Sequence, residues 1–452
     1  MDLLNNRAGL LTEGDVRTKI FDFMIPVLLG QLMQQLYLIA DAVIVGRFLN
    51  QQALASVVST SCIIFLVTGI SIALASVCEA VITTRINEKR TGEISAAVHT
   101  SVIYGLIVGL TISFAGVILA GPLLRMMRVP FDIIEDATGY LRIYFVGYAA
   151  VAMYHVLTGV IHAASDSKNP LYYLCASCVL NIVLDCVFVI VLKMGVRGAA
   201  FATVISQLFS MILVLKDLIK ATDETKLTFS GLRSTPEISA EIRSLALPVV
   251  GQDMLFDFPA VIVQIYINTF GSAAIAGIGA AVRTEELIFL FTDVFSIAAA
   301  AFISQNILAG KYERARMGMS FTMVAAILFI QCAGVLAFFL APGIIALFNG
   351  DPDVIQFGTE RLKAASLFYF LVGFGHVSSA VMRATGRAKE AMLTMFFSWF
   401  VTRIIILVTL GSVLHQIEIA YWIYPMTWML SSAVYAYFML NTEIGPEKKK
   451  YQ

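Results

Sequence analysis

Two aspartates, Asp41 and Asp185, each lie inside a long run of apolar residues. Asn181 precedes Asp185 by one helical turn, and Thr203 lies in the next apolar run. A carboxylate inside hydrocarbon is costly, so it marks a functional site by default. Two carboxylates, an amide and a hydroxyl suit a hard cation such as Na⁺, or a shared proton, because two close desolvated carboxylates do not readily stay ionised together. These four residues form a candidate cation-binding and coupling group.

A second set of acids lies in the later half of the chain. Asp257, Glu285 and Glu286 also interrupt apolar runs and could form a second site for an ion or a cationic substrate. Arg283 is close in sequence and offers an alternative, in which it neutralises one of these acids in an ion pair. The sequence leaves both interpretations open.

The composition identifies the surroundings of these acids. Of 452 residues, 59% are apolar and 14% are charged, whereas an ordinary soluble domain has about 45–50% and about 25%. We therefore expect a membrane protein, which excludes nucleic-acid binders, secreted disulfide scaffolds and soluble enzymes. The total charge says nothing about partners, because 31 basic and 31 acidic residues cancel. No HExxH, GxSxG or Walker motif is present, so we expect neither catalysis nor a cofactor or metal site.

Apolar runs bounded by charge, Gly or Pro predict twelve membrane spans. Runs of this length must be helices, because a helix satisfies its own backbone hydrogen bonds in lipid, whereas barrel strands would alternate over about ten residues. The fold is therefore expected to be all-α. The predicted spans are residues 20–49, 53–83, 95–121, 133–163, 169–192, 196–220, 238–269, 273–304, 314–341, 353–383, 388–412 and 417–441.

The placement of Lys and Arg predicts the orientation of these spans. The N-terminus, every second connection and the C-terminus together carry 21 of the 31 basic residues. The positive-inside rule makes that side cytoplasmic, so both termini are expected inside. We expect a multi-pass protein of the plasma membrane.

Internal repetition predicts two lobes. The segment GVIHAASDSKNP (residues 159–170) aligns with AVMRATGRAKEA (residues 380–391), and other segments align at the same offset. We expect six-helix lobes at residues 1–220 and 238–441, a cytoplasmic linker at 221–237 and a cytoplasmic tail at 442–452. Because six is even, a pseudo-two-fold axis along the membrane normal should relate the lobes. Such a bundle opens to one side at a time as its lobes rock, which favours transport over a channel or membrane enzyme. We expect the protein to be a monomer.

Helix rise places the first group of polar residues at one level. Asp41, Asp185 and Thr203 come to roughly 12, 10 and 9 Å below the outer surface at 1.5 Å per residue. The acids of the second half come to roughly 18–20 Å, near mid-membrane. The matched depths favour one shared site in the first lobe.

Other residues in the spans could shape the path of a substrate. Pro26 lies in the first span, fifteen residues before Asp41, and permits the helix to bend. Aromatic and Met side chains would give a cavity an adaptable surface for bulky aromatic ligands. The candidates for lining it are Met33, Tyr37, Met153, Tyr154, Phe289 and Tyr369.

Several motifs, in this order and at these spacings, resemble the multidrug and toxic compound extrusion (MATE) family, whose superfamily also contains polysaccharide and lipid flippases. The resemblance covers nearly the whole chain. The motifs are Pro26 with DAVIVGRF (residues 41–48), NIVLDCVF (181–188), GVRGAAFATVISQ (195–207), LPVVGQ (247–252) and ISQNILAGKYERA (303–315).

The resemblance implies a secondary active exporter that couples entry of H⁺ or Na⁺ to extrusion of amphipathic, often cationic compounds. The first-lobe cation site of the family maps to Asp41, Asn181, Asp185 and Thr203, and its bent first helix maps to Pro26. The segment AASLFYFLVGFGHVSSAVM (residues 364–382) of span ten has no carboxylate, so the intact first-lobe group favours the DinF-like branch. The alternative is a lipid-linked oligosaccharide flippase, which would need several basic cavity residues. Its only candidates are Arg47, Arg142, Arg283 and Arg403.

Overall fold

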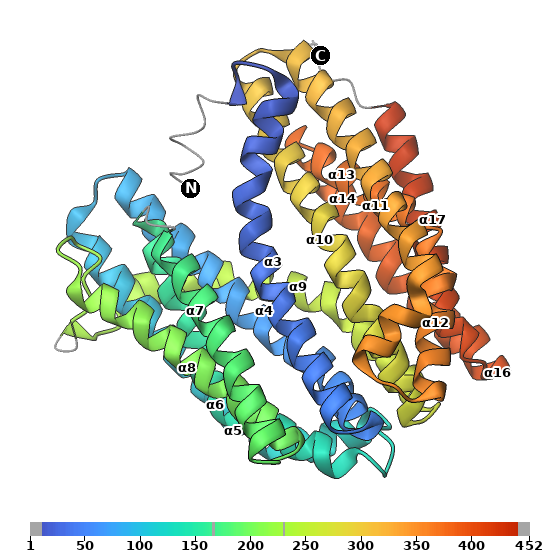
Figure 1. Ribbon diagram of the computed structural model, residues 1–452. Coiled ribbons are helices and arrows are strands. Elements are labelled where there is room, and N and C mark those ends of the chain that lie inside the picture. Colours follow the sequence, from blue (N-terminus) through green and yellow to red (C-terminus); the bar gives the residue numbers. More distant parts are fainter. Residues whose placement is uncertain (1–10, 165–167, 229–230, 442–452) are drawn as a thin grey trace. The chain divides into compact units, whose positions relative to one another are not determined.

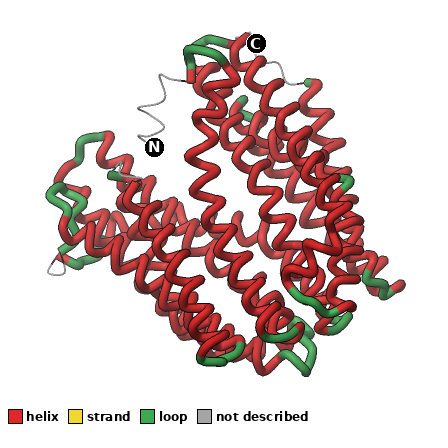
Figure 2. The backbone as a smooth tube through the Cα atoms, in the orientation of Figure 1, coloured by secondary structure: helices red, strands yellow, loops and turns green. Residues whose placement is uncertain are grey.

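The computed structural model describes residues 11–164, 168–228 and 231–441, and these residues form helices and connecting loops without a strand (Figures 1 and 2). This confirms the predicted all-α fold. The predicted tail at 442–452 and residues 229–230 of the predicted linker lie outside the described residues.

The helices of the first half match the first six predicted spans within a few residues. A π-helical segment, η1, continues α7 without a break. The elements are α3 (Val16–Phe48), α4 (Gln51–Asn87), α5 (Thr91–Met126), α6 (Ile134–Ala163), α7 (Lys168–Asp185), η1 (Cys186–Val191) and α8 (Val196–Lys220).

The helices of the second half match the other six predicted spans, two of which are interrupted. Span ten is bent by 56° between two helices, and span eleven alternates between α-helix and π-helix. The elements are α9 (Pro236–Asn268), α10 (Ser272–Leu308), α11 (Tyr312–Phe348), α12 (Pro352–Ser366), α13 (Tyr369–Ala384), α14 (Ala388–Met395), η3 (Phe396–Val401), α15 (Thr402–Ile406), η4 (Leu407–Gly411), α16 (Ser412–Leu414) and α17 (Glu418–Leu440).

Length and composition indicate how many of these helices can cross a bilayer. Among the described residues ten helical segments are long and apolar enough, and the bent α12–α13 pair gives an eleventh. The last helix, α17, is not among these segments. It has 23 residues, which include four tyrosines and two tryptophans. The chain is thus a multi-pass membrane protein, and the crossing of α17 stays a prediction.

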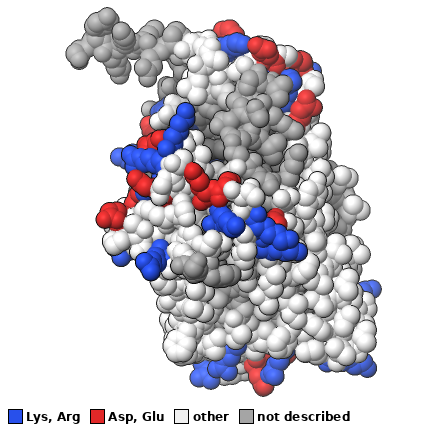
Figure 3. Space-filling view, turned by 90° about the vertical axis from the view of Figure 1, so that its left-hand side faces the viewer, with Lys and Arg blue, Asp and Glu red and all other residues white. Residues whose placement is uncertain are grey.

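The exposed surface is apolar over wide areas. Large side chains such as Phe114, Leu328 and Phe339 are exposed. On the face drawn in Figure 3, the charged side chains gather in separate zones with a broad uncharged surface between them. An exposed apolar surface of this extent is expected where lipid tails, and not water, surround the helices.

The chain packs into two compact units. One is made from residues 37–276 and the other from residues 2–36 and 277–452, as far as these are described. Helix α9 therefore belongs to the first unit, and α3 contributes its beginning to the second unit and its end to the first. The predicted lobes at 1–220 and 238–441 stay a prediction.

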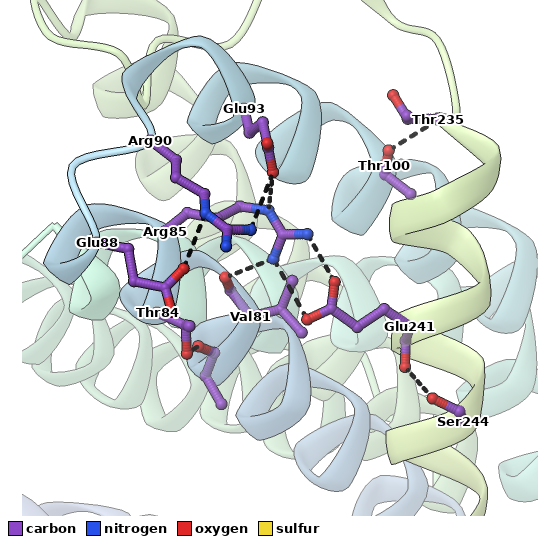
Figure 4. A network of polar contacts seen from close by, with 11 residues as sticks. Val81, Thr84, Arg85, Glu88, Arg90, Glu93, Thr100, Thr235, Glu241 and Ser244 are labelled. Carbon is purple, nitrogen blue, oxygen red and sulfur yellow. Dashed lines mark hydrogen bonds and ion pairs between the residues drawn. The ribbon is translucent and has the colours of Figure 1, made fainter.

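Polar contacts tie α9 to the first unit. Buried Arg85 of α4 donates to Glu241 of α9 (Nη2 to Oε2, 2.6 Å) and pairs with Glu93 of α5 (Nε to Oε2, 3.4 Å), as Figure 4 shows. At the other end of α9, Asn268 donates to the carbonyl oxygen of Met127 (2.8 Å). The helix is thus held at both of its ends by residues of α4 and of the α5–α6 region.

Close backbone approach sets the packing inside each unit. In the first unit α6 packs against α4, α5 and α8, and a Cβ on Gly116 of α5 would overlap the Phe145 ring of α6. In the second unit α11 packs against α12 and α13, and a Cβ on Gly334 would overlap the backbone of Ser366. Small residues at such crossings let membrane helices pack without a hydrophobic driving force.

Candidate functional site

The first unit brings the four predicted coupling residues into one region. Asp41 comes from α3, Asn181 and Asp185 from α7, and Thr203 from α8. All four are buried, Asp185 completely and Asp41 with 6% of its surface exposed. The two carboxylates interact electrostatically. The structure therefore places them as the matched depths predicted, while their role stays a prediction.

Asn181 links the two neighbouring helices at this site. With its amide oriented to satisfy both neighbours, the nitrogen donates to Asp185 Oδ2 (2.9 Å) and the oxygen accepts from the backbone N–H of Thr203 (3.2 Å). The other oxygen of Asp185, Oδ1, is buried and accepts no hydrogen bond from the described residues. A buried carboxylate oxygen without a donor costs about 1–3 kcal/mol or more, and a bound proton or cation would remove that cost.

Two tyrosines complete the site, and the sequence did not assign them to it. Tyr37 of α3, predicted to line a substrate cavity, lies close to the Thr203 side chain and within electrostatic range of Asp41 and Asp185. Tyr140 of α6 is buried and interacts with the same two acids. The sequence did contain an indication for Tyr37, because it precedes Asp41 by four residues and residues four apart share one face of a helix.

The backbone is irregular next to the site. Asp185 is the last residue of α7, and the π-helical turn of η1 begins at Cys186. Such π-helical turns are rare and are frequently found at functional sites in proteins. No feature of the sequence predicted this one.

Asp257 does not join this group and lies on α9 in the first unit, although the sequence counted it among second-lobe acids. Its Oδ2 lies 2.9 Å from the position that a Cβ on Gly69 of α4 would occupy. Asp253 precedes it by one turn. Any role of this pair stays a prediction.

The two glutamates of α10 are both held in ion pairs. Glu285 is buried and receives two hydrogen bonds from fully buried Arg361 of α12 (both 2.9 Å) and one from the Tyr369 hydroxyl (3.1 Å). Glu286 pairs with Arg283, three residues earlier (2.9 Å). The ion-pair interpretation is therefore the one that the geometry supports, and Arg361 is a partner that the sequence did not indicate.

A buried arginine lies beside this pair. Arg403 of α15 stands over the ring of Tyr424, 4.4 Å from its centroid, and Arg361 stands 4.6 Å from the same centroid. The Arg403 guanidinium also contacts the Thr427 hydroxyl (3.4 Å). In this region the second unit therefore holds two buried guanidinium groups near one buried carboxylate, whereas the coupling group of the first unit holds two buried carboxylates.

The other predicted residues lie in various environments. Pro26 is exposed within α3, which continues through it. Tyr154 is buried in the core of the first unit together with partly buried Met153. In the second unit Phe289 packs edge-on against Tyr369, with centroids 5.0 Å apart, and Met33 is partly buried. That these side chains line a cavity stays a prediction.

Similarity to known proteins covers both halves of the chain. A protein-family model described as MatE matches residues 26–187 and again residues 248–409. The chain belongs to this family. The offset between the two matches is nearly the one that aligns residues 159–170 with residues 380–391, so the MatE model also supports the internal repeat.

Individual relatives and solved structures agree with membership in the MatE family. The chain is 28% identical over 402 residues to the probable multidrug resistance protein YpnP of Bacillus subtilis, covering 88% of this chain and 89% of that protein. It is 22% identical to the multidrug export protein MepA of Staphylococcus saprophyticus, with 82% of each covered. A solved MATE family transporter in an inward-facing conformation is similar, with 20% identity, a TM-score of 0.80, and 90% of this chain and 94% of that chain covered.

Proposed function

We propose that the chain is a secondary active multidrug exporter that couples inward movement of H⁺ or Na⁺ to extrusion of amphipathic, often cationic compounds. Membership in the MatE family and similarity to proteins named for multidrug resistance and export support this proposal. The observation that carries the coupling is the buried pair of Asp41 and Asp185, with one Asp185 oxygen lacking a donor among the described residues.

The coupling residues would act by changing the charge of the first unit. A cation or proton bound at Asp41 and Asp185 neutralises charge that is otherwise buried, so the occupied and empty states favour different surroundings. Tyr37 and Asn181 position this group, through Thr203 and Asp185 respectively. Because Asp41 lies on α3, binding of the cation or proton would change the conformation of this helix, which also contains Pro26. Rocking of the lobes would then release the substrate outward.

The proposal includes a location and an orientation. We propose a monomer in the plasma membrane, and the placement of 21 of the 31 basic residues on one predicted side supports an orientation with both termini in the cytoplasm. Of the arginines that a lipid-linked oligosaccharide flippase could use, Arg283 is paired with Glu286. The relatives YpnP and MepA are named for multidrug resistance and multidrug export, so the exporter is the function that we propose.

Transport in proteoliposomes tests the proposal. We expect an imposed H⁺ or Na⁺ gradient to drive a fluorescent cationic dye across the membrane in the direction opposite to the ion. Applying the two gradients separately identifies the coupling ion. Asp41→Asn should abolish gradient-driven transport while keeping membrane insertion. The control is Asp136→Asn, since Asp136 is an exposed acid on α6. Undiminished coupled efflux by Asp41→Asn would remove this mechanism.

A further inference from the structure

A hollow opens in the first unit where α5 ends and where α6 and α8 begin. It is an open pocket with a volume of about 540 Å³. Its lining includes Gly121 and Gly139, and a Cβ on Gly139 would come within 2.9 Å of Arg197 Nε. The missing side chain at Gly139 therefore makes room for a guanidinium group. The hollow lies at the opposite end of α8 from residues 221–228, which follow that helix.

Basic side chains from three helices line the hollow. Arg125 lies near the end of α5, Arg142 lies two turns into α6, and Arg197 lies at the start of α8. The one acid in the lining is Glu135, whose carboxylate is 3.7 Å from the Arg197 guanidinium and whose side chain is 91% exposed. The lining therefore has two more positive charges than negative charges, which favours an anionic ligand.

The backbone adds to this preference. Both α6 and α8 begin at the hollow, and neither the residue before α6, Ile133, nor the residue before α8, Gly195, caps its helix through a side chain. The first N–H groups of a helix have no partner within the helix and attract anions. Side chains on a helix lean toward its N-terminus, so Arg142 is directed toward the same end of α6 as Glu135.

The position in the membrane indicates which anion is available. The hollow lies at the ends of three membrane helices, where the phosphate groups of phospholipids are found. Exposed apolar side chains lie close by in the sequence, among them Met126 and Phe131. A surplus of positive charge attracts a lipid with net negative charge more than a zwitterionic lipid, whose positive group it repels.

We propose that this hollow binds the phosphodiester headgroup of an anionic phospholipid, held by Arg125, Arg142 and Arg197. In the proposed orientation this is a lipid of the outer leaflet. The lining of the hollow includes neither Asp41 nor Asp185, and the proposal does not depend on which ion drives transport.

Native mass spectrometry of the full chain tests the proposal. After extraction from vesicles of mixed phosphatidylglycerol and phosphatidylcholine, we expect the protein to retain phosphatidylglycerol in excess. Each arginine replaced by glutamine should lower this preference by about fivefold, and the triple variant should retain the two lipids equally. Glu135→Gln should raise the preference for phosphatidylglycerol, because it removes the negative charge from the lining and keeps all three arginines. The control is Arg128→Gln, at the same end of the protein but outside the lining.

The measurement has three outcomes that count against the proposal. An unchanged preference in the triple variant would overturn it, as would a preference for phosphatidylglycerol that falls equally in Arg128→Gln. A site for free phosphate would appear as a rise of the unfolding temperature on adding inorganic phosphate in phosphatidylcholine nanodiscs, equal to the rise with phosphatidylglycerol. We expect no such rise from phosphate alone.

Discussion

Tyr37 lies one helical turn before Asp41 and interacts through its hydroxyl with Thr203 of another helix. Its hydroxyl therefore helps to hold α3 and α8 in place around the two acids. The sequence predicted Asp41, Asn181, Asp185 and Thr203 from depth, because helix rise is regular. It did not predict which side chains hold these residues, because such contacts join distant parts of the chain.

Removing the Tyr37 hydroxyl should weaken the coupling site without unfolding it. A polar interaction of a buried hydroxyl contributes about 0.5–1.5 kcal/mol, so losing the one between Tyr37 and Thr203 in Tyr37→Phe should weaken cation binding by about two- to tenfold. The measurement is the dependence of dye transport on Na⁺ concentration or pH. Tyr172→Phe is a matched control, because Tyr172 of α7 is exposed. An unchanged dependence in Tyr37→Phe would show that this hydroxyl does not act on the site.

Glu285 should matter for stability more than for coupling. Breaking a buried ion pair costs about 3–5 kcal/mol because the remaining charge is left without its partner. Glu285→Gln should therefore lower the unfolding temperature of the purified protein markedly. Glu286→Gln is the comparison, since the Glu286 side chain is 27% exposed whereas that of Glu285 is 5% exposed, so we expect a smaller loss of stability.

A double variant separates the two roles of Glu285. Glu285→Leu with Arg361→Met removes both charges, and such replacements of buried pairs are often neutral or stabilising. We expect it to recover the stability that Glu285→Gln loses. If Glu285→Gln instead keeps its unfolding temperature but loses coupled transport, Glu285 belongs to the coupling machinery.

At the scale of elements, the membrane made the helices predictable. Each apolar run had to become a helix, so α3 to α11 begin and end close to the limits of the predicted spans. The irregular segments η1, η3 and η4 were not predicted, because a π-helical turn follows from local packing and leaves no mark in the apolar pattern. The packing of α9 against helices of the first unit was not predicted either, because apolar runs do not specify which helices contact one another.

The crossing of α5 and α6 should depend on the absence of a side chain at Gly116. A Cβ there overlaps the Phe145 ring, and overpacking of this kind costs about 1–3 kcal/mol. Gly116→Ala should therefore lower the unfolding temperature. Gly343→Ala on α11 is the control, because a Cβ there meets nothing within 4 Å. Equal unfolding temperatures in the two variants would contradict the close packing of α5 and α6.

At the scale of the whole molecule, the two halves of the sequence exchange helices between the compact units. Helix α9 comes from the second half and packs in the first unit, and the start of α3 comes from the first half and belongs to the second unit. Repetition in the sequence predicted two similar halves. It could not predict this exchange, because repeat positions do not determine contacts.

The exchange predicts that the halves depend on one another. Residues 1–228 expressed alone lack Glu241 and Asn268, which hold α9 against the first unit. We expect each half alone to be degraded or to aggregate, and residues 1–228 and 231–452 to purify together when they are co-expressed. The measurement is recovery in detergent by size-exclusion chromatography. A stable, monodisperse product from residues 1–228 alone would contradict this prediction.

The sharing of α3 has a consequence for its length. This single helix contributes residues up to Leu36 to one unit and residues from Tyr37 onward to the other. Each residue of an α-helix advances the side-chain direction by about 100°, since about 3.6 residues complete a turn. Inserting or deleting one residue between Pro26 and Asp41 would therefore rotate the side chains at one end of α3 by about 100° relative to those at the other end.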